Sequence, residues 1–215
     1  MVFLTEHRGN AEQALRFFQA LERFVFGCEL SVIDNTVRED RFSLALEKVG
    51  DPAVYEPGGA LDLSDGERND FVFRLNRSAK IDRQRRMLMI RIEAALGERK
   101  VLSRRSDITV EHVLPAGGGP YWDTRFPDRV LRQDAANLLG NLVLITRRQN
   151  QRADNKSYPE KRDVYFNTKT APIHAVTRDI EPIAEWSLDA IEGRHEELMR
   201  ILGEDWDLVR VDQRR

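Results

Sequence analysis

The sequence predicts a mostly helical α+β protein, in which a helical bundle surrounds a small unit of two strands and one helix. Apolar residues recur at helical spacing along most of the chain. Two short β-branched segments, 108–113 and 142–145, interrupt that pattern. Of the 215 residues, 41% are hydrophobic and 33% are charged, which is ordinary for a globular protein with a real core.

The first 106 residues are expected to form a helical subdomain. Asn10 with Gln13, and Ser64 with Glu67, are spaced like helix-starting capping boxes. Further helices are expected over about 35–49 and 79–96. The last of these carries four arginines that we expect to point largely outward, namely Arg83, Arg85, Arg86 and Arg91. Residues 166–215 are expected to hold a final helix, begun by Ser187, that packs on this subdomain.

Residues 107–165 are expected to form the ββα unit. The segment 108–113 predicts the first strand, and a long connection, 114–138, follows it. The segment 142–145 predicts the second strand, after which Thr146 is placed to cap a helix over 147–154.

Charge along the chain is uneven, although the net charge is only −2. Residues 74–105 hold 11 Lys and Arg against 3 Asp and Glu, and residues 147–162 hold 6 against 2. Taken alone, such runs are more often solvated helix faces. Because they lie immediately before and immediately after the segment with the two predicted strands, and because binding phosphates requires local positive charge, they favour a nucleic-acid partner.

Several classes of protein are excluded or disfavoured. No apolar run reaches the ~18 residues that span a bilayer, and the first ten residues lack a signal-peptide pattern. The single cysteine, Cys28, excludes an internal disulfide. No P-loop motif for nucleotide binding is present. A cytoplasmic protein without a membrane segment is the expectation.

The candidate site begins with V-E-H-V-L-P at 110–115 and continues with L-G-N-L-V-L at 139–144. A neutral histidine accepts a proton near pH 7, so His112 is the candidate general base. Glu111 and Asn150 offer oxygen ligands, which suit Mg²⁺ or Mn²⁺ better than zinc. Asn141, at the start of the second strand, is expected to orient the ring of His112.

Several side chains near this set have more ordinary interpretations. Asn155 is either a further ligand or, by about two to one, a helix cap. Neighbouring strand residues point to opposite faces, so Glu111 and His112 can share a metal only where the strand ends or bends. The remaining histidines, His7, His174 and His195, are expected at the surface.

These motifs, together with N-Q-R-A-D-N-K-S-Y-P-E-K-R at 150–162, give the segment 107–165 a resemblance to HNH (His–metal-finger) nucleases. It resembles in particular the C-terminal domain of GmrSD-type modification-dependent restriction endonucleases and SspE-like phage-defence proteins. The nine-residue step from Asn141 to Asn150 is similar to that in the HNH domain of the single-chain CRISPR effector nuclease. The resemblance implies His112 as base, Glu111 and Asn150 as metal ligands, and Asn141 as orienter.

The expected function is therefore a metal-dependent DNA endonuclease or nickase of a restriction or phage-defence system. DNA is the expected partner, contacted by Arg147, Arg148, Arg152 and Lys156 beside the site. The resemblance also implies a nucleotide-hydrolysing sensor domain, N-terminal or on a separate chain. The alternative is a DNA-binding module of the same fold without catalysis, favoured by glutamate at 111 where many such sites have aspartate. A purely structural helical domain is a third and much weaker interpretation.

Overall fold

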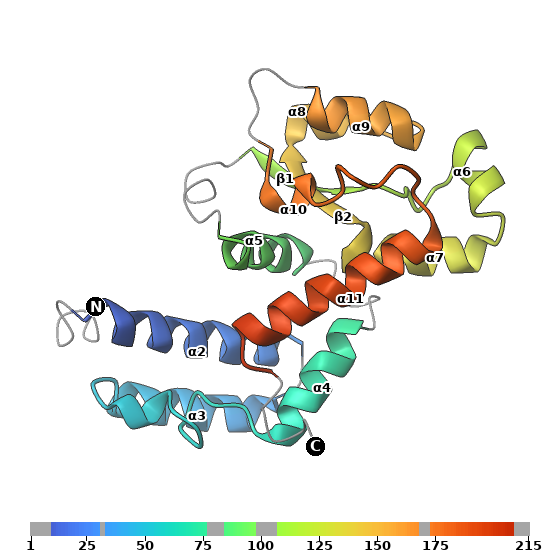
Figure 1. Cartoon of the computed structure of the whole chain (residues 1–215). Helices are drawn as coiled ribbons and strands as arrows, with labels where there is room; N and C mark the ends of the chain where they lie inside the picture. Colours follow the sequence, from blue (N-terminus) through green and yellow to red (C-terminus); the bar gives the residue numbers. More distant parts are fainter. Residues whose placement is uncertain (1–9, 31–32, 77–83, 98–106, 168–172, 209–215) are drawn as a thin grey trace, which may run out of the picture. The chain divides into compact units, whose positions relative to one another are not determined.

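The computed structural model describes residues 10–30, 33–76, 84–97, 107–167 and 173–208. The described chain is mostly helical with one two-stranded sheet, which confirms the predicted fold class (Figure 1). The chain divides into two compact units: unit 1 comprises residues 1–75 with 203–215, and unit 2 comprises 76–202. No helix among the described residues is long and apolar enough to cross a membrane.

Unit 1 is built from helices, two of which start at the predicted capping residues Asn10 and Ser64. Asn10 Oδ1 accepts a hydrogen bond from the Gln13 backbone N–H at 3.1 Å, and Ser64 and Glu67 form a reciprocal capping box. Its elements are α2 (Ala11–Glu29), α3 (Asn35–Glu47), the 3₁₀ turn η1 (Pro52–Val54) and α4 (Asp65–Asn76).

A buried carboxylate holds unit 1 together. Asp62 pairs with Arg23 of α2 and Arg68 of α4, and both guanidinium groups also reach backbone carbonyls at 206–207. Trp206 packs against Phe26 and Phe71, with ring centroids 4.9 and 5.5 Å apart. The residues around 206 therefore complete a core whose other members lie before residue 75.

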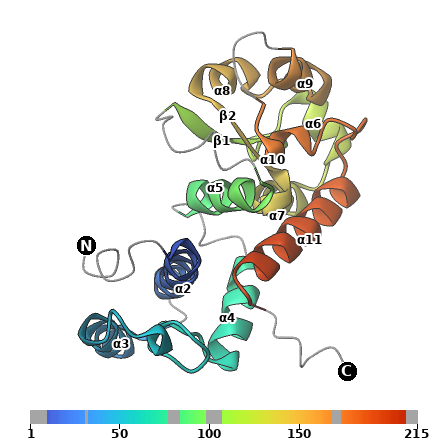
Figure 2. The same cartoon turned by 60° about the vertical axis from the view of Figure 1, so that its left-hand side comes forward.

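Unit 2 contains the sheet. β1 (Ile108–His112) and β2 (Leu142–Thr146) are antiparallel, with Ile108 opposite Thr146 and His112 opposite Leu142. Helices α8 and α9 lie on one side of this hairpin and α5 on the other (Figures 1 and 2). The helices are α5 (Arg85–Ala95), α6 (Pro120–Arg125), α7 (Arg129–Asn137), α8 (Arg147–Ala153), α9 (Tyr158–Phe166), α10 (Ala175–Arg178) and α11 (Leu188–Asp205), with the 3₁₀ turn η3 (Leu139–Asn141) before β2.

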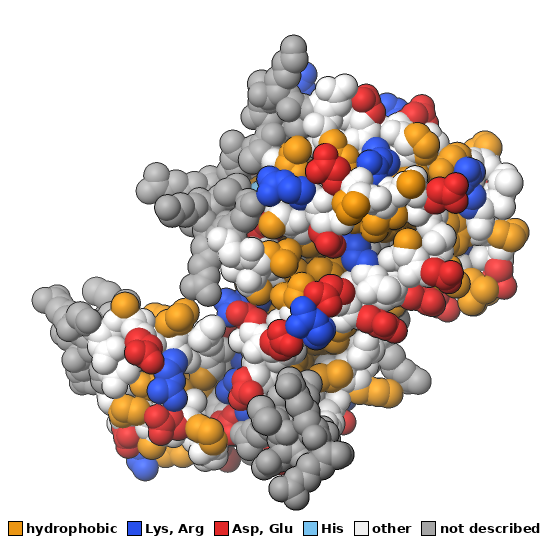
Figure 3. Space-filling view, in the orientation of Figure 1, with side chains coloured by type: hydrophobic (Ala, Val, Ile, Leu, Met, Phe, Trp, Pro, Cys, Tyr) orange, Lys and Arg blue, Asp and Glu red, His pale blue; other side chains and the backbone are white. Residues whose placement is uncertain are grey.

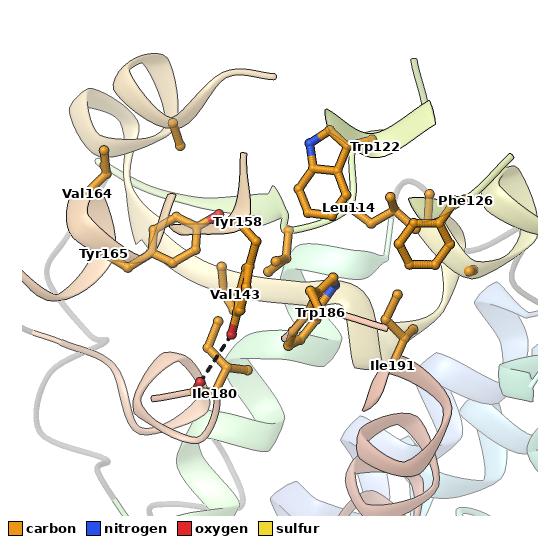
Figure 4. Packing of buried hydrophobic residues seen from close by; sticks show 14 of the residues in the cluster. Leu114, Trp122, Phe126, Val143, Tyr158, Val164, Tyr165, Ile180, Trp186 and Ile191 are labelled. Atoms are coloured by element: carbon orange, nitrogen blue, oxygen red, sulfur yellow. Dashed lines mark hydrogen bonds between the residues drawn. The ribbon is translucent and has the colours of Figure 1, made fainter. Parts of the chain in front are cut away.

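The core of unit 2 is aromatic (Figure 4). Trp122, Tyr158, Tyr165 and Trp186 are almost completely buried in one cluster, in which Leu114 lies beside Trp122 and Phe126. The polar ends of these rings have partners: the Tyr158 hydroxyl donates to carbonyls near α10, and the Trp122 indole donates to the Lys156 carbonyl at 3.0 Å. This core fixes the segments that follow β1 and α8.

The structure adds elements that the sequence pattern did not single out, among them α6, α9 and α10. The basic helix expected over 79–96 begins at Arg85 in the structure, and residues 79–83 lie outside the described part. The helix after β2 starts as predicted, because Thr146 and Gln149 form a full capping box.

Candidate active site

The site residues of β1 point to opposite sides of the hairpin. β1 pairs with β2 as far as His112, so the strand is regular and alternates its side chains through that residue. Glu111 is buried on the side of α9, whereas the half-buried His112 meets Arg85 of α5. Neither the strand end nor a bend brings the two side chains onto one face.

Glu111 is held in a buried ionic cluster. Its Oε1 accepts hydrogen bonds from Lys161 Nζ at 2.6 Å and from the Tyr165 hydroxyl at 3.2 Å. Lys161, only 1% exposed, also donates to the backbone carbonyl of His112 at 2.7 Å. Burial raises the pKa of Glu111 against the opposing effect of Lys161, and burial likewise lowers the pKa of Lys161. The pair therefore fixes the end of β1 at both a side chain and the backbone.

His112 faces a second cation. One guanidinium nitrogen of Arg85 lies 2.9 Å from His112 Nε2, and the other donates to Asn137 Oδ1 at 2.6 Å. Arg85 is 9% exposed, so the expectation that this arginine points outward is wrong. It is the first residue of α5, whose apolar face packs inward through Leu88 and Ile92.

Asn141 holds the backbone that follows His112. Its fully buried amide accepts from the Leu114 N–H at 2.7 Å and the Trp186 indole at 3.0 Å, and donates to the carbonyls of Leu114 and Ala136. These bonds engage groups other than the His112 ring. In this arrangement Asn141 constrains residues 113–114, and so acts on His112 through the chain.

The turn that carries Asn141 requires the glycine before it. A Cβ on Gly140 would lie 2.0 Å from the Ile191 carbonyl oxygen, so α11 touches this backbone directly. Arg194 of α11 donates to the Gly140 and Leu142 carbonyls at 2.5 and 2.9 Å. The L-G-N-L motif thus marks a point where a turn docks on a helix.

The residues expected to bind metal are placed by α8 and β1. Asn150 donates from its amide nitrogen to the Val110 carbonyl at 3.0 Å, which ties α8 to β1. Asn155 is exposed beyond the end of α8. Among the described residues, no three His, Cys, Asp or Glu side chains gather where they could hold a metal ion.

The predicted DNA-binding residues lie on one continuous segment. Arg147, Arg148 and Arg152 are exposed on α8, and Lys156 is exposed just after it. On the face drawn in Figure 3, Lys and Arg side chains alternate with Asp and Glu side chains.

The other described histidines are buried and structural, which corrects the expectation that they lie at the surface. His174 Nδ1 is 3.2 Å from Glu93 Oε1, and Glu93 also accepts two backbone N–H groups at the start of α10. His195 Nε2 is 3.2 Å from Asn76 Oδ1. His7 lies outside the described residues.

Lys161 and Tyr165 were not predicted as site residues, and Arg85 was predicted only as an outward-pointing arginine. The first two had a signal: Ser157 and Glu160 form a capping box, and a helix begun there puts residues 161 and 165 on one face. Arg85 had none, because its neighbours are equally basic and only tertiary packing selects one of them.

Comparison with known families gives one match. The sequence profile of the family described as GmrSD restriction endonucleases, C-terminal domain, matches residues 65–201, which is more than half of the chain. No curated protein and no solved structure matches the chain. The matched range contains the hairpin, α5, and the α9 residues that contact Glu111. The chain belongs to the family of GmrSD restriction endonuclease C-terminal domains.

Proposed function

We propose that this chain is a DNA endonuclease or nickase in which His112 is the general base. Membership of a restriction endonuclease family supports a nuclease. The observation that carries the assignment to His112 is its placement: it is the last residue of β1, half-buried, with its backbone held by Lys161 and its ring beside Arg85. A ring held in this way has little orientational freedom to lose during reaction.

The proposed chemistry is hydrolysis of a phosphodiester. His112 takes a proton from water, the resulting hydroxide attacks phosphorus, and the bond to the 3′ oxygen breaks as that oxygen takes a proton from solvent. Negative charge builds on the phosphate oxygens as the hydroxide adds, so nearby guanidinium groups stabilise this state more than the bound substrate. The arginines and lysine on 147–156 bind the flanking phosphates of the DNA.

We also propose a requirement for Mg²⁺ or Mn²⁺, which would supply charge stabilisation at the phosphate. The side chains as they stand fit this only in part. Asn150 presents a neutral amide oxygen, but Glu111 Oε1 is occupied by Lys161 and Tyr165 on the other side of the strand from His112. Glu111 Oε1 can serve as a ligand only if its contact with Lys161 opens.

The experiment that tests the base is plasmid nicking by wild type and His112→Ala. We expect the variant to lose about 10²–10⁴ in rate, while its thermal unfolding and its affinity for duplex DNA stay close to wild type. Nicking at the wild-type rate by His112→Ala would overturn the assignment.

The same experiment separates the alternative of a DNA-binding module without catalysis. The Glu111–Lys161 pair is the observation in its favour, because it withdraws the predicted carboxylate from ion binding. Such a module binds duplex DNA but nicks no faster than a heat-inactivated sample. A sensor domain, N-terminal or on a separate chain, remains part of the proposal, and adding the cognate partner would reveal activity that depends on it.

A further inference from the structure

Arg85 makes an unusual contact with the proposed base. A guanidinium group has only N–H donors, so at 2.9 Å the His112 Nε2 atom must accept. The ring is then neutral and carries its hydrogen on Nδ1. The second guanidinium nitrogen donates to Asn137 Oδ1 at 2.6 Å, so two nitrogens of the planar group are hydrogen-bonded at once. A lysine ammonium does not have this planar two-nitrogen geometry.

The helix that supplies Arg85 is anchored at both ends. Near its start, Arg86 Nε donates to the Ile108 carbonyl at 3.3 Å, and near its end Glu93 binds His174 and the first turn of α10. Leu88, Met89 and Ile92 are completely buried between these points. The position of Arg85 is therefore set by packing of the whole of α5.

The contact also occupies the place that the reacting water needs. Nδ1 already bears a hydrogen, so Nε2 is the only ring atom that can take the proton from water. A water at hydrogen-bond distance from Nε2 must replace the guanidinium there. A phosphate can accept hydrogen bonds from two guanidinium N–H groups through two of its oxygens, and so can replace His112 Nε2 as the partner of Arg85.

We propose that Arg85 is a positioning residue that holds Nε2 of His112 ready as proton acceptor, and that it transfers to the scissile phosphate when DNA binds. This inference rests on the proposed function, since it requires His112 to be the base. Before DNA arrives, the guanidinium selects the ring tautomer; afterwards it neutralises the phosphate and leaves Nε2 to the water. Arg85 itself neither gains nor loses a proton.

The first test reads the tautomer directly, without any cleavage. The ring ¹⁵N resonances of His112, identified by their loss in His112→Ala, are recorded at a pH where the ring is neutral. We expect the Nδ1–H form in wild type, a shift towards Nε2–H in Arg85→Ala, and partial retention in Arg85→Lys, which keeps one donor. Adding duplex DNA in the presence of chelator should change the Nε2 resonance in wild type. In Arg85→Ala the Nε2 resonance should be the same with and without DNA.

The second test is kinetic, with Arg129→Ala as the matched control. This variant removes the same charge from the first position of α7, where the side chain is exposed. We expect Arg85→Ala to lower kcat by about 10²–10³ with a smaller change in KM, and Arg129→Ala to keep the wild-type kcat. An identical tautomer in wild type and Arg85→Ala, or equal losses in both alanine variants, would overturn the role of Arg85. Failure of the proposed function is a different result, namely wild-type nicking by His112→Ala.

Discussion

Two adjacent residues of one strand have opposite environments. Glu111 contacts a lysine and a tyrosine in the buried core, whereas His112 contacts an arginine and is half-buried. A carboxylate taken out of water needs its partner, because an unpaired buried charge is far more costly than an exposed one. Lys161 is therefore more important to folding than the typical surface lysine.

Replacing Lys161 by methionine should expose this cost. The change keeps the side-chain length but leaves Glu111 buried without its cation, and we expect a loss of ~3–5 kcal/mol in the free energy of unfolding. Urea denaturation measures it. The double variant Lys161→Met with Glu111→Gln removes both charges and should regain most of the loss. A single variant as stable as wild type would show that the pair contributes nothing.

His195 should make the stability of the protein sensitive to mild acid. Burial lowers its pKa from the ordinary 6.5. Because the folded value is the lower one, its contribution is complete above pH 6.5 and is lost as the pH falls through the folded pKa. Urea denaturation above and below that pH should show the decline, and His195→Gln, which keeps a donor for Asn76, should reduce it. An unchanged decline in that variant would assign it to other groups.

At the scale of the elements, α8 follows directly from β2 and carries the exposed arginines. Each phosphate contact that is removed should lower the slope of log affinity against log salt by roughly 0.9 on duplex DNA. We expect Arg148→Ala and Arg152→Ala to weaken binding equally on all sequences and to flatten this slope. Arg200→Ala is a suitable control, because Arg200 pairs with Glu197 on α11. Slopes that equal the wild type would mean that DNA contacts another surface.

Elements with local signals were predictable from the sequence. Helices that begin with capping residues start where expected at Asn10, Ser64 and Thr146, and both strands were located from their β-branched residues. The facing of single side chains was not predictable, because it depends on which neighbour fills the space. Arg85 and His195 both looked exposed in the sequence pattern and are buried.

The site shows the same division between local and tertiary information. His112, Asn141 and Asn150 were chosen from a motif. In the structure His112 lies on β1, Asn141 in the turn before β2, and Asn150 on α8. Their contacts could not be derived from the motif. Asn141 binds Leu114 and Trp186, which lie 27 and 45 residues away in the chain. The assignment of roles at this site remains a prediction.

For the whole molecule, the central expectation is dependence on a divalent cation. We expect nicking to require Mg²⁺ or Mn²⁺ and to cease in excess chelator, since the phosphate carries charge that one histidine cannot offset. Asn150→Ala should raise the metal concentration that gives half-maximal rate. If Glu111 is a ligand, Glu111→Ala does the same; if it serves only Lys161, that variant is less stable at every metal concentration. Full activity in chelator would refute the requirement.

The aromatic contact of Trp206 with Phe26 and Phe71 has a consequence for biosynthesis. A ribosome releases residues 76–202 before Trp206, so unit 2 has its whole sequence available while unit 1 still lacks part of its core. Until the segment around 206 emerges, Phe26 and Phe71 in residues 10–75 lack their contact with Trp206. Chaperones that bind exposed aromatic surface would therefore bind residues 10–75, although this segment leaves the ribosome long before the segment around 206.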